Sequence, residues 1–268
     1  MIKRELYMNR IRPFIGGELI KVMTGIRRSG KSVMLELIKE ELAEAGVAPS
    51  QMISINFEDM RYSHLQTATA LHDEIIKRAE GIEGKAYLFF DEIQEVEGWE
   101  KCVNSLRVAL DCDIYITGSN AKLLSGELAT YIGGRYVEFV IYPFSFAEFL
   151  ELYHTIAPSD SIQQCFQKYL LAGGMPYLAN LRYEEEPSRQ YLTDLFNSVQ
   201  LKDIVKRNKI RDIDLLERII AYMTANVGTV FSASSLAKFF KNEQRTVAAE
   251  TILNYVRYCC DAYLFYQV

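Results

Sequence analysis

Short hydrophobic runs alternate with amphipathic stretches through roughly the first half of the chain. The runs are rich in β-branched and aromatic residues and predict buried strands at 19–25, 52–59, 85–92, 113–120 and 135–143. The stretches between them repeat apolar residues at helical spacing and predict helices at 31–46, about 64–79 and 99–110. Strands that alternate with helices require right-handed crossovers, so the pattern predicts an α/β fold with a doubly wound parallel sheet.

The β pattern ends at Pro143, and helical periodicity dominates the rest of the chain. Helical segments are predicted within 144–154, 161–181, 189–210 and 214–226, with a Gly-Gly-Met-Pro break at 173–176. From Ser232 onward, a helix, a short polar turn and a second helix predict a helix-turn-helix of the winged type. Ser232 or Ser234 is the expected N-cap of its first helix, and 263–268 is the expected first strand of the wing.

These patterns divide the chain into three parts. We predict an α/β core at 1–143, an all-α, lid-like helical region at 144–211 and a winged-helix-like segment at 212–268. No second wing strand follows the first. We therefore expect the winged-helix segment to be truncated and the chain to be part of a longer protein.

Composition excludes several classes of protein. The 268 residues are 49% hydrophobic and 24% charged with a net charge of −5, which is ordinary for a soluble protein and argues against a wholesale nucleic-acid binder. Neither an apolar N-terminal segment nor a run of membrane-spanning length is present in the sequence, so we expect no secretory signal and no membrane partner. The 5 cysteines form no C-x-x-C pair and predict reduced, mostly structural thiols in a cytoplasmic protein.

Charge is distributed unevenly along the chain. Residues 201–268 hold ten Lys/Arg and seven Asp/Glu, although the whole chain has a net charge of −5. A mildly basic C-terminal segment is compatible with a contact to double-stranded DNA. A few solvated lysines on helix surfaces explain the same excess, so the sequence leaves DNA and protein partners open.

The first predicted strand runs into a glycine-rich loop, "GIRRSGKS", at residues 25–32. The loop matches G-x-x-x-x-G-K-[ST], in which glycines allow backbone N–H groups to point inward at phosphate oxygens, and the following helix adds its positive dipole end. Lys31 is expected to reach the β- and γ-phosphates, and the Ser32 hydroxyl is expected to ligate Mg²⁺. The predicted nucleotide-binding residues are Gly25, Ile26, Arg27, Arg28, Ser29, Gly30, Lys31, Ser32 and Val33.

A second motif ends the third predicted strand, where "YLFFDE" finishes in two acids. Ligands bind at the carboxyl ends of the strands in a doubly wound sheet, so we expect Asp91 to hold the Mg²⁺ shell with Ser32. Glu92 is predicted to polarise a water molecule for attack on the γ-phosphorus. A water-activating acid favours hydrolysis over phosphoryl transfer and argues against a small-molecule kinase. A surface acid pair that caps the next segment is the alternative explanation.

Polar residues beside two further strands complete the predicted site. Ser119 or Asn120 is the candidate γ-phosphate sensor, because "YITGSN" ends the fourth strand, which is expected to place these side chains between the third and the first strands. Ordinary turn chemistry is the alternative. Arg135 is the candidate arginine finger, acting from its own chain or from a neighbour's, and an exposed arginine at a strand start is the alternative. The predicted catalytic residues are Glu92, Lys31, Asn120, Ser119 and Arg135.

These stretches together resemble a prokaryotic family of AAA+-type ATPases. The resemblance lies in "IKVMTGIRRSGKS", "LFFDEIQEVEGWE", "IYITGSNAKLLSGE", "GGRYVEFVIYPFSFAEF", "LAGGMPYL" and "LKDIVKRNKIRD". It implies a three-layer P-loop core, a helical region, a winged-helix segment and a C-terminal domain of unknown function. It further implies ATP binding at 25–32, a second nucleotide motif at Asp91 and Glu92, and a sensor position at Ser119 and Asn120. The helical region departs from the pattern because it has no clear second-sensor arginine.

The leading hypothesis is an ATP-hydrolysing switch. ATP or ADP and Mg²⁺ bind at the core, and hydrolysis moves the winged-helix segment, which contacts DNA or a partner protein. The alternative is a nucleotide-stabilised DNA-binding regulatory module with little turnover. Its support is a group of basic residues near the second helix of the helix-turn-helix: Lys238, Lys241, Arg245 and Arg257. The sequence also leaves a homo-oligomer open.

Overall fold

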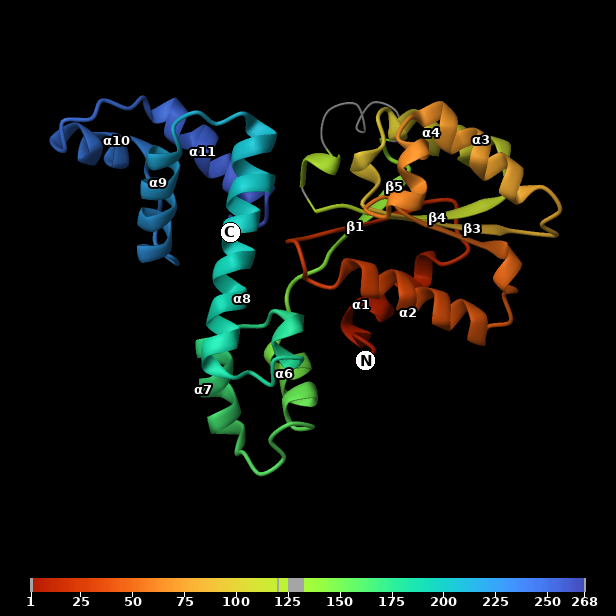
Figure 1. The fold of residues 1–268 in the computed structure, drawn as a ribbon, viewed down its shortest axis with the longest axis horizontal. Helices are drawn as coiled ribbons and strands as arrows, with labels where there is room; N and C mark the ends of the chain where they lie inside the picture. Colours follow the sequence, from red (N-terminus) through yellow and green to blue (C-terminus); the bar gives the residue numbers. More distant parts are fainter. Residues whose placement is uncertain (1, 120, 125–132, 268) are drawn as a thin grey trace. The chain divides into compact units, whose positions relative to one another are not determined.

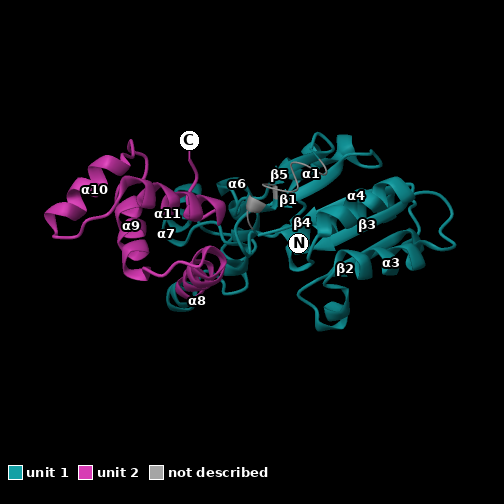
Figure 2. Ribbon diagram, turned by 90° about the horizontal axis from the view of Figure 1, so that it is seen from above, with its two compact units in different colours: residues 1–190 teal, residues 191–268 magenta. Residues whose placement is uncertain are grey.

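The computed structural model describes residues 2–119, 121–124 and 133–267. The chain forms two compact units, residues 1–190 (unit 1) and residues 191–268 (unit 2) (Figure 2). Unit 1 contains the β-sheet, and every regular element among the described residues of unit 2 is a helix. The division into three parts at 1–143, 144–211 and 212–268 stays a prediction.

A five-stranded parallel sheet forms the centre of unit 1 (Figure 1). Its strands are β1 (Ile20–Thr24), β2 (Met52–Asn56), β3 (Ala86–Asp91), β4 (Cys112–Thr117) and β5 (Tyr136–Val140). The order is β2-β3-β4-β1-β5 with every pair parallel, so the predicted doubly wound α/β fold is confirmed. Parallel strands bring their carboxyl ends to one edge, and the ends of β3, β4 and β1 are therefore neighbours.

Helices cover both faces of the sheet (Figure 1). One face carries α1 (Glu5–Ile11) and α2 (Lys31–Glu44), and the other carries α3 (Ala68–Ala79) and α4 (Trp99–Ala109). In β1, Met23 packs into the α1–α2 core, whereas Ile20 and Val22 pack into the α3–α4 core. Because the central strands are buried on both faces, they read in the sequence as nearly continuous apolar runs.

Two segments of this core differ from the predicted boundaries. α3 begins at Ala68 rather than near His64, because the Thr67 hydroxyl accepts the N–H of Ala70 at 3.3 Å and caps the helix there. The preceding residues, Met60–Leu65, form a 3-10 helix. The N-terminal residues, for which the pattern predicted no element, form α1.

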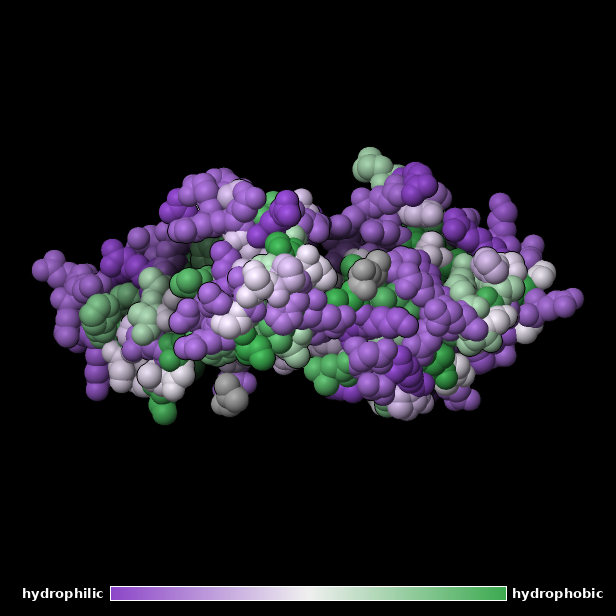
Figure 3. All heavy atoms as spheres, turned by 90° about the horizontal axis from the view of Figure 1, so that it is seen from below, coloured by the Kyte–Doolittle hydropathy of each residue, from purple (hydrophilic) through white to green (hydrophobic). Residues whose placement is uncertain are grey.

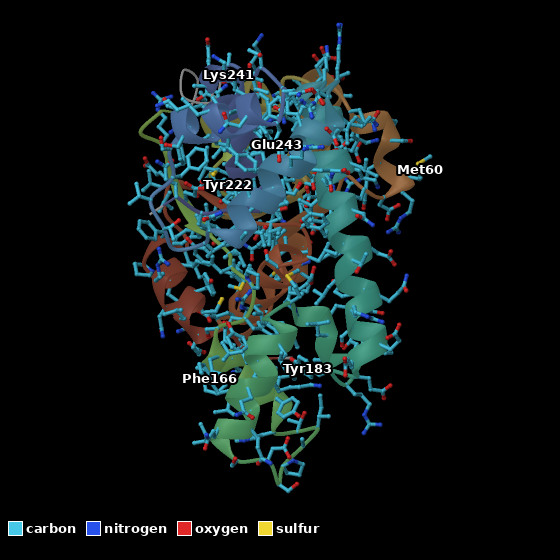
Figure 4. All side chains as sticks on the ribbon, turned by 90° about the vertical axis from the view of Figure 1, so that its left-hand side faces the viewer. Met60, Phe166, Tyr183, Tyr222, Lys241 and Glu243 are labelled. Atoms are coloured by element: carbon cyan, nitrogen blue, oxygen red, sulfur yellow. The ribbon has the colours of Figure 1, made fainter. Side chains whose placement is uncertain are left out.

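α6 (Phe146–Tyr153) and α7 (Ile162–Ala172) follow β5 within unit 1, and the predicted break at 173–176 separates α7 from a 3-10 helix (Pro176–Ala179). An aromatic cluster holds this region together. The ring centroid of Phe149 lies 5.2 Å from that of Tyr169 and 4.9 Å from that of Tyr183. Tyr183 is buried, whereas Phe166 lies at the surface of α7 (Figure 4).

Unit 2 is built from helices. They are the end of α8 (Glu185–Ser198), a π-helix (Val199–Lys206), α9 (Ile213–Ala225), α10 (Ala233–Asn242) and α11 (Ala249–Asp261). The last three share a core that includes Leu215, Leu236 and Ile252. The Ser232 hydroxyl accepts the N–H of Ser235 at 3.3 Å and caps α10, as one of the two predicted caps. The predicted helix, turn and helix are thus present.

The strand expected at 263–268 is not formed in the described residues 263–267, which are turn, bend and irregular chain. Tyr263 has a φ of 56° and donates its N–H to the carbonyl oxygen of Cys260 at 2.9 Å. Leu264 donates to the carbonyl oxygen of Cys259 at 3.0 Å. These two bonds form a Schellman motif that ends α11. The prediction of a wing strand is therefore wrong here, because the backbone is used to end a helix.

No helix among residues 2–119, 121–124 and 133–267 is both long enough and apolar enough to cross a membrane. The face drawn in Figure 3 is mainly hydrophilic, with small and separate hydrophobic patches. One exposed apolar side chain is Met60, which protrudes from its 3-10 helix (Figure 4).

Candidate functional site

The loop between β1 and α2 has left-handed backbone at both of its glycines. Gly25 has a φ of 139°, and a Cβ at this position would lie 2.3 Å from the carbonyl oxygen of Ile141. Gly30 has a φ of 101° and is the N-cap of α2. The loop therefore turns tightly into the helix, whose first N–H groups have no intrahelical acceptor. This is the backbone arrangement of a phosphate-binding cradle.

Lys31, the first residue of α2, is buried at the centre of the site. Its Nζ donates to the carbonyl oxygens of Gly25 and Ile26, each at 3.2 Å. The same atom lies 3.9 Å from Oε1 of Glu92. The ammonium group therefore lies between the loop and the end of β3, within reach of a phosphate held by the loop.

Asp91 ends β3, and its carboxylate is buried. Oδ1 accepts the Thr117 hydroxyl at 2.5 Å, and Oδ2 accepts the Asn56 amide at 3.1 Å. The Ser32 hydroxyl lies near this carboxylate. Burial raises the pKa of Asp91, while the hydrogen bond from Thr117 and the nearby Ser32 hydroxyl oppose this change. Ser32 and Asp91, which are predicted to share a magnesium ion, are therefore neighbours at the site.

Glu92 has a left-handed backbone with a φ of 56°. Its N–H donates to Oγ1 of Thr117 at 2.9 Å, and its carboxylate accepts a hydrogen bond from the amide of Gln94. Left-handed backbone is uncommon for residues other than glycine, and it is concentrated at functional sites. Gln94 and Thr117 together fix the position of the carboxylate that the sequence predicts to be a general base.

Two serine hydroxyls at the site are buried without a hydrogen-bond partner among the residues that the structure describes. They are Oγ of Ser29 in the loop and Oγ of Ser119 after β4. Such an orphaned group costs about 1–3 kcal/mol, so a polar ligand that reaches it is stabilised. β4 lies between β3 and β1, as predicted for the sensor strand. The other sensor candidate, Asn120, lies outside the described residues.

Arg135 is not brought to this site. Its carbonyl oxygen accepts the N–H of Ile20 at 2.9 Å, so Arg135 lies beside the beginning of β1, whereas the glycine loop follows the end of β1. A strand of 5 residues spans about 16 Å. The exposed Arg135 guanidinium contacts Asn104 at 3.3 Å instead. A role on the nucleotide of its own chain does not fit this position, and a role on a neighbouring copy stays a prediction.

The other predicted loop residues are less buried. Arg27 pairs with Glu58 at 3.4 Å, Arg28 is exposed with a φ of 66°, and Val33 is exposed on the first turn of α2. Ile26 is half-buried and contributes the carbonyl oxygen that Lys31 contacts.

Arg4 lies against the loop and was missed by the sequence analysis. Its side chain is buried, and Nη1 donates to the carbonyl oxygen of Ser29 at 2.9 Å. No motif spacing connects residue 4 to the loop, because only the fold brings them together. The signal in the sequence is limited to an arginine in an N-terminal segment with alternating charged and apolar residues.

The residues present fit a nucleotide with a bound magnesium ion. The loop and Lys31 supply hydrogen-bond donors for phosphate oxygens. The Ser32 hydroxyl and the Asp91 carboxylate are oxygen ligands of the kind that Mg²⁺ prefers. The unpartnered hydroxyl of Ser29 lies in the same loop as these donors.

Comparisons with known proteins cover most of the chain. Residues 18–150 match a family model described as an AAA domain, and residues 163–268 match a domain of unknown function. An uncharacterized protein of Haemophilus influenzae is 38% identical over 268 residues, which are 100% of this chain and 66% of that protein. An uncharacterized protein of Methanocaldococcus jannaschii is 33% identical over 259 residues, or 92% of this chain and 56% of that protein. The chain thus spans just under two-thirds of the first relative and just over half of the second.

Three solved structures are also similar. The Aeropyrum pernix ORC1 protein in complex with DNA has 13% identity and a TM-score of 0.43, over 97% of this chain and 83% of that chain. AMPPCP-bound DnaA from Aquifex aeolicus has 15% identity and a TM-score of 0.41, over 95% and 87%. The replication initiator DnaA bound to AMPPCP and single-stranded DNA has 14% identity and a TM-score of 0.48, over 95% and 87%. The fold assignment depends on the observed sheet and on the AAA family model rather than on these likenesses.

Proposed function

Because the chain belongs to the AAA+-type P-loop ATPase family, we propose that it binds ATP with Mg²⁺ and hydrolyses it to ADP and phosphate. One observation carries this proposal, namely the convergence of an ammonium group and two acids at one edge of the sheet. Lys31 Nζ lies 3.9 Å from Oε1 of Glu92, and the Ser32 hydroxyl lies near the carboxylate of Asp91. A glycine loop alone would support phosphate binding, whereas the adjacent acids support hydrolysis.

The loop binds and orients the triphosphate in this proposal. The first N–H groups of α2 donate to phosphate oxygens, and Lys31 exchanges its contacts with loop carbonyl oxygens for the β- and γ-phosphates. Ser32 and Asp91 hold the Mg²⁺ ion, which when bound neutralises charge on the β- and γ-phosphates. Asp91 must be ionised for this role, and the hydrogen bond from Thr117 and the nearby Ser32 hydroxyl favour the ionised form.

Glu92 is the proposed general base. Its carboxylate accepts a proton from a water molecule while the water oxygen attacks the γ-phosphorus and ADP leaves. Gln94 donates to Oε2 of Glu92, and Lys31 lies beside Oε1, so the two carboxylate oxygens have separate neighbours. The buried hydroxyl of Ser119 is proposed to donate to the γ-phosphate, which would distinguish ATP from ADP.

Mg²⁺-dependent release of phosphate by the purified chain tests the proposal. Lys31→Ala is expected to abolish ATP binding, and Glu92→Gln is expected to slow turnover by about 100-fold or more while binding is kept. Glu95→Gln is the matched control, because Glu95 is an exposed acid on the 3-10 helix that follows Glu92. A parent chain without affinity for ATP in the presence of Mg²⁺ would refute the proposal. Equal turnover in Glu92→Gln and parent would refute only the role of Glu92.

We further propose that hydrolysis is coupled to movement of unit 2, through which the chain contacts DNA or a partner protein. The helix-turn-helix of α10 and α11 is a type of module that contacts DNA or protein. Lys238 and Lys241 are exposed on α10 and provide positive charge for a phosphate backbone. The alternative is a DNA-binding regulatory module in which nucleotide only stabilises the fold. A turnover rate that is negligible with and without DNA would favour this alternative.

A further inference from the structure

Arg4 is a buried arginine whose donors are used by three segments that are distant in sequence. Nη1 donates to the carbonyl oxygen of Ser29 in the glycine loop at 2.9 Å. Nη2 donates to the carbonyl oxygen of Tyr142, after β5, at 2.8 Å. Nε donates to Oε1 of Glu148, in the first turn of α6, at 2.7 Å. A single guanidinium therefore connects the loop to the beginning of the helical hairpin α6–α7.

The surroundings of Arg4 hold its side chain in one place. The guanidinium carbon lies 4.6 Å from the ring centroid of Tyr7 and 5.1 Å from that of Phe144, and both rings favour the cation. The backbone of Arg4 is left-handed, with a φ of 47° and a ψ of 48°. A residue other than glycine keeps this conformation only where the rest of the structure requires it. The unfavourable backbone conformation of Arg4 thus occurs together with a side chain whose hydrogen bonds and ring contacts hold it in place.

The contact with Ser29 controls the direction of the next N–H group. In a trans peptide unit the C=O and the following N–H point in opposite directions, and the described chain has no cis peptide bond. Because Arg4 holds the Ser29 carbonyl oxygen, the N–H of Gly30 points away from Arg4. A Cβ at position 30 would lie 3.3 Å from Nη1 of Arg4, so the guanidinium packs directly against the loop.

Glu148 shares its carboxylate between Arg4 and the cap of α6. Oε1 accepts Nε of Arg4, while Oε2 accepts the N–H of Ser145 at 2.9 Å and its hydroxyl at 3.0 Å. Burial opposes ionisation, but the Arg4 guanidinium and the Ser145 N–H outweigh it and hold the pKa of Glu148 below its ordinary value. A charged carboxylate therefore joins the support of the loop to the first turn of α6.

We propose that Arg4 is a positioning residue for nucleotide binding, which acts through the loop backbone and, through Glu148, ties the loop to α6. By fixing the Ser29 carbonyl oxygen it keeps the N–H of Gly30 directed at the phosphate. The inference rests on the proposed function, because it assigns Arg4 a task at the same site. Arg4 itself does not contact the reacting atoms.

Binding of Mg²⁺-AMPPCP, measured by calorimetry beside thermal unfolding without nucleotide, tests this role. Arg4→Met leaves Glu148 buried without its cation and is expected to lower stability. The double variant R4M/E148M removes both charges, so its stability is expected to recover in part, short of the loss of the bonds between Glu148 and Ser145. Its Kd is nevertheless expected to be at least about tenfold weaker than the parent's, because the Ser29 carbonyl has lost its charged donor. Arg12→Met is the matched control, since Arg12 is an arginine of the same N-terminal segment that forms an exposed ion pair with Glu5 and a partly buried one with Glu41 of α2.

A purely structural Arg4 predicts that Kd recovers together with stability in R4M/E148M, and that result would overturn the inference. If the double variant does not fold, Arg4→Lys is measured instead. Lysine keeps the positive charge beside Glu148 but cannot donate to all three acceptors of Arg4. A Kd for Arg4→Lys equal to the parent's would then overturn the inference. A parent chain that binds no Mg²⁺-AMPPCP would instead refute the proposed function, so the two failures are distinguishable.

Hydrogen exchange tests the link to α6. In the parent chain, Mg²⁺-AMPPCP is expected to slow amide exchange in the first turns of α6, because the loop and Glu148 are joined through Arg4. In R4M/E148M the same protection is expected to be lost. Equal protection of α6 in both proteins would overturn the proposed link.

Discussion

Thr117 is hydrogen-bonded to both acidic residues of the site. Its hydroxyl donates to Oδ1 of Asp91 at 2.5 Å and accepts the N–H of Glu92 at 2.9 Å. Thr117→Val keeps the shape and removes both bonds, so we expect a loss of about 1–3 kcal/mol in the free energy of unfolding. Burial already raises the pKa of Asp91, and loss of the Thr117 bond raises it further. Because the proposed ATP hydrolysis requires the Asp91 carboxylate, the acid limb of the pH–ATPase profile is expected to move to higher pH.

Thr117→Ser is the control for this prediction, because it keeps the hydroxyl and loses only a methyl group. We expect its acid limb to coincide with that of the parent. An unchanged acid limb in Thr117→Val would show that the hydroxyl does not stabilise the ionised form of Asp91.

The predictable site residues are those at a fixed distance from a strand end. Asp91 ends β3, Glu92 follows it, and Lys31 begins α2 after the loop that leaves β1. Parallel strands bring such positions to one edge of the sheet. Arg135 precedes its strand, and this direction alone assigns it to the opposite edge. Arg4 could not be predicted, because its contacts depend on tertiary packing across 25 and 144 positions of sequence.

At the scale of elements, the break after α7 contains two glycines with different requirements. Gly173 has a φ of 76°, and a Cβ there meets nothing within 4 Å, whereas a Cβ at Gly174 would lie 2.1 Å from the carbonyl oxygen of Phe144. We expect Gly173→Ala to cost about 1 kcal/mol for its left-handed backbone. Gly174→Ala is expected to cost about 1–3 kcal/mol or more, because backbone must move to make room. Thermal unfolding of the two variants measures the difference.

The Gly174 carbonyl oxygen also accepts the N–H of Phe144 at 2.7 Å, so this glycine joins the chain before α6 to the chain after α7. This close backbone contact explains why glycine is required at position 174. Equal losses in Gly173→Ala and Gly174→Ala would contradict this explanation.

The strands were predictable because burial on both faces produces apolar runs that end at turn residues. Other elements carry weaker signals. α1 has only 7 residues, which is too short for a clear helical period. The π-helix at Val199–Lys206 continues the apolar periodicity of α8, so the pattern predicted one uninterrupted helix. The end of α11 depends on a left-handed Tyr263, a residue whose type favours strands.

At the scale of the whole molecule, unit 2 offers less positive charge to a binding partner than its count of basic residues indicates. Arg245 pairs with Asp212 at 2.6 Å and also contacts Asp214, so it joins the turn before α11 to the beginning of α9. This arginine was one of the residues proposed for DNA contact, and its charge is used inside the unit. Lys238 and Lys241 are exposed on α10, the latter at its C-terminal end (Figure 4).

Positive charge that contacts DNA and positive charge that pairs inside unit 2 can be distinguished in one experiment. The affinity for duplex DNA is measured by fluorescence anisotropy over a range of salt concentrations. If α10 contacts phosphates, the double variant K238Q/K241Q is expected to bind more weakly and to lower the salt slope by about two. Arg245→Met is expected to lower the thermal stability of unit 2, because Asp212 and Asp214 lose their common partner, while the salt slope of the folded protein stays unchanged. A parent chain without salt-dependent DNA affinity would contradict the DNA contact and favour a protein partner, since counterion release accompanies any phosphate contact.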